Sequence, residues 1–304
     1  MRVLVTGANG YVGSAVVAAL LQAGHSPVAL VRGDRSRVPV GVEVRSGDLL
    51  DPASLMAAMV DMEAVCHLAG LTRARESWDR PLDYFRVNVG GTLALLGAMV
   101  AAGVKRVVFA STGSIYGSPE QQPMTEDFRD AAPHPYAASK QAAECAVEWQ
   151  ARAGGMSAVV LRLFNVAGGD DPDQTRIVPR VLAVASGQSP NLEVNGDGSA
   201  IRDLLNVSDA AEAFVASLAH GPDAVRRYNV GSGVGASVME IVKAAERVTG
   251  QPVPVVHRPP ADEPARLLSD ASRALAELGW KPRHSIVDEI LRDAWSATYA
   301  RARD

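Results

Sequence analysis

A glycine-rich turn between an apolar strand and an apolar helix constrains the fold of this chain most. Arg2–Thr6 is rich in valine and leucine, which is typical of a strand buried on both faces. Gly7–Gly13 follows with the spacing Gly-x-x-Gly-x-x-Gly, and a helix is predicted at Ser14–Gln22, ended by Gly24. Glycines here permit a tight turn, and free backbone N–H groups and the helix dipole would meet the charge of a pyrophosphate. The pattern therefore predicts a dinucleotide site in an α/β fold.

Strand and helix patterns continue to alternate through the first half of the chain. Further buried strands are predicted at 27–31, 42–45, 64–70, 105–110 and 158–164. Predicted helices fall between them, one started by Pro52, one ending at Ala102 and one at 136–153. Alternation of this kind, with short links, predicts a Rossmann-type doubly wound parallel sheet whose ligand lies beyond the carboxyl ends of its strands.

The pattern changes after residue 165, and we infer two domains from that change. The second half is predicted to contain a hairpin-type turn at Asn195–Gly198, a strand at 199–207 and helices at 177–186, 209–219, 237–248, 270–278 and 285–299. It has no second glycine-rich phosphate turn. Residues 1–165, joined by about 204–230, are therefore expected to form the dinucleotide-binding domain, and residues 166–304 mainly a smaller α/β substrate-binding domain.

Charge and composition exclude several classes of protein. The 304 residues are 47% hydrophobic and 21% charged with a formal net charge of -4, so neither nucleic acid nor an anionic membrane is an expected partner. No apolar run reaches the ~18 residues of a membrane span, and the N-terminus lacks signal-peptide features. The two cysteines, Cys66 and Cys145, are expected to be buried thiols, which favours a cytoplasmic protein. No metal site is predicted.

Tyr136 and Lys140 are the strongest candidates for catalysis. They lie four residues apart on one face of a predicted helix, and Pro133 and Pro135 place Tyr136 near its N-terminus. The helix dipole and the ammonium of Lys140 would favour phenolate and lower the phenol pKa from its usual ~10. Tyr136 is therefore a candidate general base. The strand before it ends in Ser111–Gly117, whose hydroxyls could bond the same substrate oxygen.

The tip of the second strand bears on the choice between NAD and NADP. An acidic side chain there accepts the adenosine ribose hydroxyls, whereas an arginine accommodates a 2'-phosphate. Val31 and Arg32 occupy the tip, which favours NADP. Asp34 lies about 20 residues beyond Gly13 and keeps NAD open.

These motifs resemble the extended short-chain dehydrogenase/reductases, and among them the NAD-dependent epimerase/dehydratase branch that includes UDP-glucose 4-epimerases. The similarity extends over nearly the whole chain. It rests, in order, on Thr6–Gly13, Gly47–Leu49, His67–Gly70, Pro81–Thr92, Ser111–Gly117, Tyr136 with Lys140, Arg162–Asn165 and Arg202–Asp203. The resemblance implies a nicotinamide cofactor and a nucleotide-sugar substrate that is UDP- or dTDP-linked.

The same resemblance implies a role for each matching residue. Thr112, Tyr136 and Lys140 would form the catalytic group, and Lys140 would also hold the nicotinamide ribose. The cofactor would be bound by Gly7, Asn9, Gly10, Tyr11, Val12, Gly13, Arg32, Asp48, Leu49, Leu68, Ala69, Gly70, Asn88 and Ser111, together with Tyr136 and Lys140. The substrate would be bound by Thr72, Thr112, Ser114, Tyr136, Asn165, Arg176, Arg202, Arg258 and Arg266. Arg202 would pair with the diphosphate, helped by Arg258 or Arg266.

The residues after Thr112 narrow the reaction that the resemblance implies. Sugar 4,6-dehydratases carry acidic residues there, and decarboxylases a nearby glutamate, whereas this chain has Gly113 and Ser114. Epimerisation through a 4-keto intermediate is the expected reaction, with reduction of a keto sugar by NADPH as the alternative that Arg32 favours. A non-catalytic cofactor-binding regulator is a third reading, against which both Tyr136 and Lys140 are present. A homodimer is expected through the Tyr136 helix and the long helix before the fifth strand.

Overall fold

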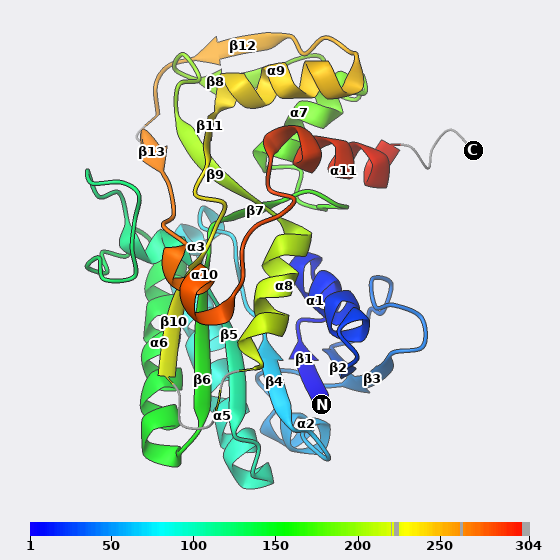
Figure 1. Ribbon diagram of the computed structural model, residues 1–304, viewed down its shortest axis with the longest axis vertical. Coiled ribbons are helices and arrows are strands. Elements are labelled where there is room, and N and C mark those ends of the chain that lie inside the picture. Colours follow the sequence, from blue (N-terminus) through cyan, green and yellow to red (C-terminus); the bar gives the residue numbers. More distant parts are fainter. Residues whose placement is uncertain (220, 222–224, 262–263, 300–304) are drawn as a thin grey trace.

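The largest element of the fold is a seven-stranded parallel sheet (Figure 1), in a computed structural model that describes residues 1–219, 221, 225–261 and 264–299. Its strands are β1 (Arg2–Thr6), β2 (Ser26–Val31), β3 (Glu43–Ser46), β4 (Ala64–His67), β5 (Arg106–Thr112), β6 (Ser157–Leu163) and β10 (Val225–Val230). They follow the order β10-β6-β5-β4-β1-β2-β3, and each neighbouring pair is parallel. The order reverses between β1 and β4, which is where a doubly wound sheet binds its ligand. The predicted Rossmann-type fold is confirmed.

Helices cover both faces of this sheet, and each face has its own apolar core. One face carries α1 (Tyr11–Gln22), α8 (Val207–Ser217) and α10 (Ser272–Leu278). The other carries α2 (Pro52–Ala58), α5 (Gly91–Ala102) and α6 (Pro135–Gly154). Since β1 and β4 are buried between these layers, their carboxyl ends are held rigidly where the site lies.

The remaining elements form a smaller α/β unit beyond the carboxyl ends of the large sheet (Figure 1). Its strands are β7 (Asn165–Ala167), β9 (Ile201–Asn206), β11 (Gly235–Ser237) and β13 (Arg266–Leu267) in one sheet, and β8 (Leu192–Asn195) and β12 (Val255–Arg258) in another. Its helices are α7 (Ile177–Ala185), α9 (Val238–Thr249) and α11 (Val287–Tyr299), which bury a third apolar core. Between β9 and β11 the chain returns to the large sheet as α8 and β10.

Two local predictions were wrong. Asn195–Gly198 is a turn but no hairpin, because β8 pairs with β12 whereas β9 pairs with β7, β11 and β13. The chain changes sheets at Gly198, where a Cβ would lie 2.8 Å from the side chain of Met239. Cys66 is buried as expected, but Cys145 is exposed because α6 turns that face away from the sheet.

The helix that leads into β5 starts in short, irregular pieces. α3 (Glu76–Asp79), α4 (Pro81–Tyr84) and a π-helical turn at Phe85–Gly90 precede α5. Among the described residues, Pro81–Ala102 is long and apolar enough to cross a membrane by length and composition alone, which was not expected from the sequence. Several of its apolar side chains, Leu95 and Met99 among them, lie in the core of the first domain.

Candidate active site

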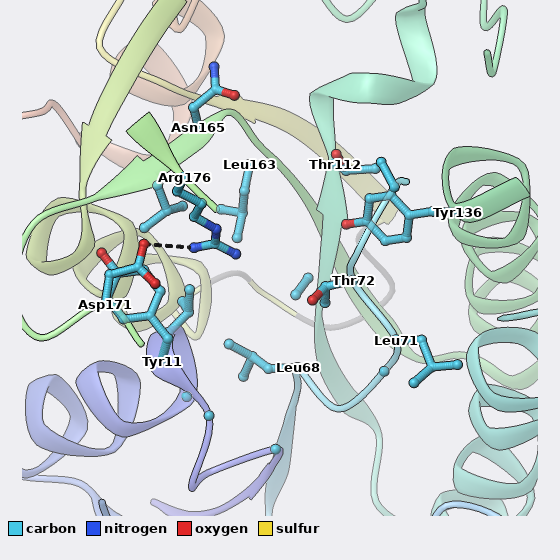
Figure 2. Close-up of a pocket in the computed structure, with 18 of the residues that line it drawn as sticks. Tyr11, Leu68, Leu71, Thr72, Thr112, Tyr136, Leu163, Asn165, Asp171 and Arg176 are labelled. Carbon is cyan, nitrogen blue, oxygen red and sulfur yellow. Dashed lines mark hydrogen bonds and ion pairs between the residues drawn. The ribbon is translucent and has the colours of Figure 1, made fainter. Parts of the chain in front are cut away.

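A large cavity lies where the strand ends of the seven-stranded sheet and its helices (the first domain of the sequence analysis) meet the smaller α/β unit (the second). Its volume is about 1530 Å³, and Figure 2 shows residues from both domains around it. From the residues predicted to hold a cofactor, those that line it are Gly7, Asn9, Gly10, Tyr11, Val12, Gly13, Arg32, Asp48, Leu49, Leu68, Ala69, Gly70 and Ser111. From the predicted catalytic and substrate-binding residues, those that line it are Thr72, Thr112, Ser114, Tyr136, Lys140, Asn165, Arg176 and Arg202.

The glycine turn has the shape that a bound pyrophosphate requires. Gly7 has a φ of 70°, and a Cβ there would lie 2.8 Å from the backbone nitrogen of Ala69. A Cβ on Gly13 would lie 2.0 Å from the carbonyl oxygen of Gly7. No side chain caps α1, and its first residues, Tyr11 to Gly13, line the cavity, so backbone N–H groups of its first turn are available to an anion there. The residues present fit a dinucleotide.

A buried histidine ties the glycine turn to the strand beside it. The His67 ring lies 2.7 Å from the Thr6 hydroxyl through Nδ1 and 3.0 Å from the Thr92 hydroxyl through Nε2. Thr92 donates its own proton to the carbonyl of Asn88, so Nε2 of His67 must donate and Nδ1 must accept. Burial, and then the charge of Lys140, lowers the pKa of His67 to about 3, which keeps the ring neutral. Thr6 in turn accepts the N–H groups of the segment that follows β4.

Asn88, predicted to bind the cofactor, does not line the cavity but bonds residues next to it. Its side chain accepts the N–H of Leu71 at 2.8 Å and donates to the Leu71 carbonyl and to the Ser139 hydroxyl. Ser139 donates to the carbonyl of Tyr136. A Cβ on Gly70 would lie 2.7 Å from the amide oxygen of Asn88, so Asn88 sits behind the cavity wall. It therefore joins the cofactor cleft to the helix that carries Tyr136.

The loop after β2 places a carboxylate in the cavity wall. Asp34 lines the cavity and accepts a hydrogen bond from the side chain of Asn9 at 3.0 Å. Arg32 has an 80% exposed side chain, and its guanidinium lies 3.9 Å from the carboxylate of Asp48. Asp34 is thus held against the glycine turn, whereas Arg32 extends into solvent. This arrangement suits ribose hydroxyls better than a 2'-phosphate.

α6 brings Tyr136 to the cavity at its N-terminus. The ring nitrogen Nδ1 of His134 accepts the N–H of Ala137 at 3.1 Å and caps the helix, and Pro135 occupies the first helical position. Figure 2 shows the Tyr136 hydroxyl pointing into the cavity next to Thr112 at the end of β5. The predicted catalytic pair is therefore assembled on one wall.

The protein groups around Tyr136 do not produce the low pKa that was predicted. Burial raises the pKa of Tyr136, and the Thr112 hydroxyl and the charge of Arg176 oppose that rise. Lys140 lies one helical turn along, with its ammonium 4.2 Å from the centroid of the Phe109 ring. The prediction of a net lowering was wrong, because desolvation of the phenolate outweighs the nearby donors and charges.

The burial of the charged Lys140 side chain lowers the stability of the fold. Burial lowers its pKa to about 8, and Glu144 acts in the opposite direction. The unfolded chain therefore binds this proton more tightly, and the cost is fully present below pH 8 and fades as the pH rises toward 10.5. We expect Lys140→Met to raise the free energy of unfolding by about 2–4 kcal/mol at neutral pH.

Urea unfolding of Lys140→Met and the unaltered protein at pH 7 and near pH 10.5 checks this expectation. The stability gap between the two proteins should shrink at the higher pH as the lysine loses its proton in both states. A gap that stays constant with pH would assign the stability change to packing instead of charge.

A cluster of buried charged side chains connects α6 to the neighbouring strands. Ser111 lines the cavity, but its hydroxyl donates to the carboxylate of Glu144. Arg162, with no exposed side-chain surface, donates to Glu144 at 2.7 Å and also to Asp130 at 2.7 Å. The guanidinium of Arg227 lies 3.5 Å from Glu144 as well. Glu144 thus locks the catalytic helix to β5 and β6.

The cavity wall formed by the smaller α/β unit presents an amide and two arginines that were predicted to bind the substrate. The side chain of Asn165 donates to the carbonyl of Asp203 at 3.0 Å. Arg202 donates to the carbonyls of Ile201 and Pro264 and lines the cavity. Arg176 enters from the start of α7 with Asp171, its partner at 3.2 Å, on its outer side (Figure 2).

Two predicted substrate arginines lie outside the cavity wall, and two arginines that were not predicted, Arg75 and Arg180, line it. Arg258 is not in the cavity wall, but β12 pairs with β8 and places its guanidinium on Glu193, which lines the cavity. Arg266 is also absent from the wall, on the short edge strand β13. Arg180 lines the cavity and donates to the carbonyl of Glu193 at 2.7 Å. Its place four residues after Arg176 on an amphipathic helix was a signal that could have found it.

No group of three or more histidine, cysteine, aspartate or glutamate side chains within the described parts of the chain could hold a metal ion. The titratable groups of the cavity include Tyr136 and Lys140 together with several arginines and carboxylates, Arg75 and Glu193 among them. Together with the glycine turn, they place the phenol of Tyr136 at one end of a dinucleotide cleft. An arginine-bearing wall for a second, anionic ligand faces them.

Known proteins share both the sequence and the fold. The sequence pattern of the NAD dependent epimerase/dehydratase family matches residues 3–231. The chain is 37% identical to the UDP-glucose 4-epimerase of Corynebacterium glutamicum, covering 99% of this chain and 96% of that protein. It is 39% identical to that of Azospirillum brasilense, covering 97% and 91%. The structure of a Stenotrophomonas maltophila UDP-glucose-4-epimerase with bound NAD and formylated UDP-arabinopyranose matches with a TM-score of 0.93 at 34% identity, covering 100% of this chain and 99% of that one.

These matches agree with the site built from the residues. NAD is the cofactor of the family, and the NADP that Arg32 favoured stays a prediction. The matched region includes the glycine turn, Tyr136, Lys140 and β10. The chain belongs to the NAD-dependent epimerase/dehydratase family of enzymes.

Proposed function

We propose that this enzyme is a nucleotide-sugar 4-epimerase that interconverts UDP-glucose and UDP-galactose. The observation that carries the proposal is the meeting of Thr112, Tyr136 and Lys140 on one wall of the cavity that the glycine turn also lines. Relatives at 37% and 39% identity, matched over nearly their whole length, are UDP-glucose 4-epimerases. A nicotinamide bound along the glycine turn and the hydroxyl of Tyr136 could therefore act on the same carbon of the sugar.

Tyr136 would hold the proton of the sugar's 4-hydroxyl while that carbon is oxidised, and would return it afterwards. When bound, NAD supplies the hydride acceptor for this step. Thr112 would bond the same sugar oxygen, and its hydroxyl and the charge of Arg176 oppose the effect of burial on the pKa of Tyr136. The ammonium of Lys140, one turn below, would hold the nicotinamide ribose.

The residues next to Thr112 support epimerisation over dehydration. A Cβ on Gly113 would lie 2.8 Å from the ring of Phe164, so no acidic side chain fits there without a shift. Ser114 follows in the cavity wall and carries no carboxyl group. Elimination of water would need a separate acid and base at that place, whereas epimerisation needs the one proton carrier that Tyr136 provides.

The direct test is to incubate the enzyme with UDP-galactose, once without added cofactor and once with NAD, and to separate the sugar nucleotides. We expect UDP-glucose to form without net consumption of NAD, because the hydride is returned in each turnover. A parallel incubation with dTDP-glucose tests the other nucleotide that the sequence resemblance implied. Oxidation of NADPH by a keto sugar with no interconversion of the two UDP-sugars would contradict the proposal and favour a ketoreductase.

We also propose a homodimer formed through the outer faces of α5 and α6. Exposed apolar side chains lie there, with Leu93 and Val100 on α5 and Trp149, 70% exposed, on α6. Ala138 and Ala142 continue the α6 face toward Tyr136 and allow close helix packing. Light scattering on the purified protein should give twice the chain mass, and a single-chain mass would contradict this assembly.

A further inference from the structure

The segment Gly168–Arg176, which we call the strap, joins β7 to α7 and carries residues of the cavity wall. Both domains hold it. From the first domain, the hydroxyl of Tyr11 donates to the Gly168 carbonyl at 2.6 Å, and Arg37 donates to the carbonyl of Asp170 at 2.9 Å. From the second domain, the carboxylate of Asp293 accepts the N–H of Gly169 at 2.7 Å. The strap is therefore fastened across the domain boundary.

The backbone of Gly168 is the most constrained part of the strap. Its φ is 92°, and a Cβ there would lie 3.0 Å from both the Asn206 amide nitrogen and the Asp293 carboxylate. Burial and the nearby charge of Asp171 raise the pKa of Tyr11, so its hydroxyl keeps its proton and acts as a donor. The hydrogen bond between Tyr11 and Gly168 is thus part of the framework and takes no share in proton transfer.

Tyr11 also touches both halves of the site. It is the first residue of α1, among the N–H groups of the glycine turn that would meet the cofactor's pyrophosphate. Its ring lies under the guanidinium of Arg176, 5.5 Å from the Cζ atom, at the end of the strap on the substrate side. Figure 2 shows Tyr11 and Arg176 on the same side of the cavity, opposite Thr112 and Tyr136. One side chain therefore connects the cofactor turn to the substrate wall.

We infer that Tyr11 is a positioning residue that couples the two binding events: a cofactor on the glycine turn and a nucleotide diphosphate on the substrate wall each favour the fastened strap, and so each tightens the other. This inference rests on the proposed function, which supplies the nucleotide. A ligand that binds better when the strap is fastened shifts the protein toward that arrangement. Linkage then requires the effect to be equal in both directions.

The test is a titration of NADH fluorescence in the absence and presence of saturating UDP. In the unaltered protein we expect UDP to tighten NADH binding by about ten-fold, within the usual range of coupling between sites. Tyr11→Phe keeps the ring beneath Arg176 and the backbone N–H groups but loses the bond to Gly168. Its coupling factor should fall below about two-fold, while NADH affinity measured alone changes far less.

Tyr228→Phe is the matched control. It removes a tyrosine hydroxyl that donates to Glu277 at 2.8 Å, outside the cavity wall, and should keep the full coupling factor. A second variant, Arg37→Met, removes the hydrogen bond and the ion pair that Arg37 makes with Asp170 of the strap. Because the Arg37 side chain is partly exposed, the variant should fold, and its coupling factor between UDP and NADH should fall. Thermal unfolding of each variant separates a loss of coupling from a loss of fold.

Each outcome has one meaning. An equal factor in Tyr11→Phe and Tyr228→Phe would overturn the inference and leave the epimerase proposal standing. If UDP bound the unaltered protein but did not change its affinity for NADH, the inference would also be overturned and the epimerase proposal would stand. A protein that binds NADH but shows no affinity for UDP would overturn the proposed nucleotide substrate, and the coupling with it.

Discussion

Tyr136→Phe is expected to lower kcat for UDP-galactose by about 10²- to 10⁴-fold, the usual contribution of a positioned acid–base group. The phenylalanine keeps the contact with the edge of the Tyr84 ring, whose centroid lies 6.3 Å away, but it has no oxygen to take the proton of the sugar hydroxyl. Binding of NADH should persist, because the glycine turn and the loop at Asp34 are untouched. Steady-state kinetics and an NADH titration on the same preparation measure both quantities.

The control for this variant is again Tyr228→Phe, whose hydroxyl lies outside the cavity wall. It should retain kcat within about two-fold, since a residue remote from the reacting atoms contributes little to the barrier. If Tyr136→Phe kept more than about a tenth of the activity, Tyr136 would not be the proton carrier. A regulator without catalytic function would be indifferent to the change altogether.

Glu144→Ala is expected to lower the free energy of unfolding by about 3–5 kcal/mol, because it leaves the buried guanidinium of Arg162 without its fully buried partner. The Glu144 side chain is 1% exposed and that of Arg162 is not exposed at all, so water cannot replace the lost carboxylate. Asp130 remains on the other side of Arg162 but cannot reach its Nε, which bonds Glu144 at 3.1 Å. Urea unfolding monitored by circular dichroism measures the change.

Glu148→Ala supplies the matched comparison one turn further along α6. Glu148 pairs with Arg227 at 2.7 Å, but both side chains are partly exposed, and such pairs contribute at most about 1 kcal/mol. A loss of similar size in both variants would mean that the burial of Arg162 is not what makes the cluster sensitive. The stability of α6 would then depend on its apolar contacts.

The parts of the site that could be predicted from the sequence are those that depend on short-range geometry. The glycine turn at 7–13 required only a strand before it and a helix after it, and the structure shows that a Cβ on Gly13 would clash with the backbone of Gly7. Tyr136 and Lys140 share a helix face because of their spacing, and the prolines near the helix start set its beginning. The Rossmann-type sheet followed from alternation alone.

The parts that could not be predicted depend on contacts between distant segments. β10 carries Arg226, Arg227 and Asn229 and lacks an apolar pattern, yet it closes the sheet beside β6, with Tyr228 and Val230 buried in the core and Arg227 paired with Glu144 and Glu148. The raised pKa of Tyr136 reflects burial, which spacing does not reveal. The placement of Arg258 beside Glu193 depends on a pairing with β8, about 60 residues away, that no local pattern encodes.

The residues of the cavity wall could also be predicted only in part from the sequence. Arg176 and Arg202 were predicted from resemblance, whereas Arg180 enters the cavity through the helical geometry of α7. Asn88 was assigned to the cofactor, but its hydrogen bonds to Leu71 and Ser139 place it behind the wall. Whether a polar residue faces a cavity or supports it depends on the hydrogen bonds it makes across the fold, which only the structure shows.

The most direct test of the account is to equilibrate UDP-galactose with the enzyme and NAD in heavy water and to examine the UDP-glucose formed by mass spectrometry. The account has Tyr136 removing only the hydroxyl proton, while the hydrogen on the reacting carbon is transferred within the site and returned. It therefore predicts UDP-glucose with no deuterium bound to carbon. Deuterium on the sugar carbon, or no UDP-glucose at all, would contradict the proposed reaction.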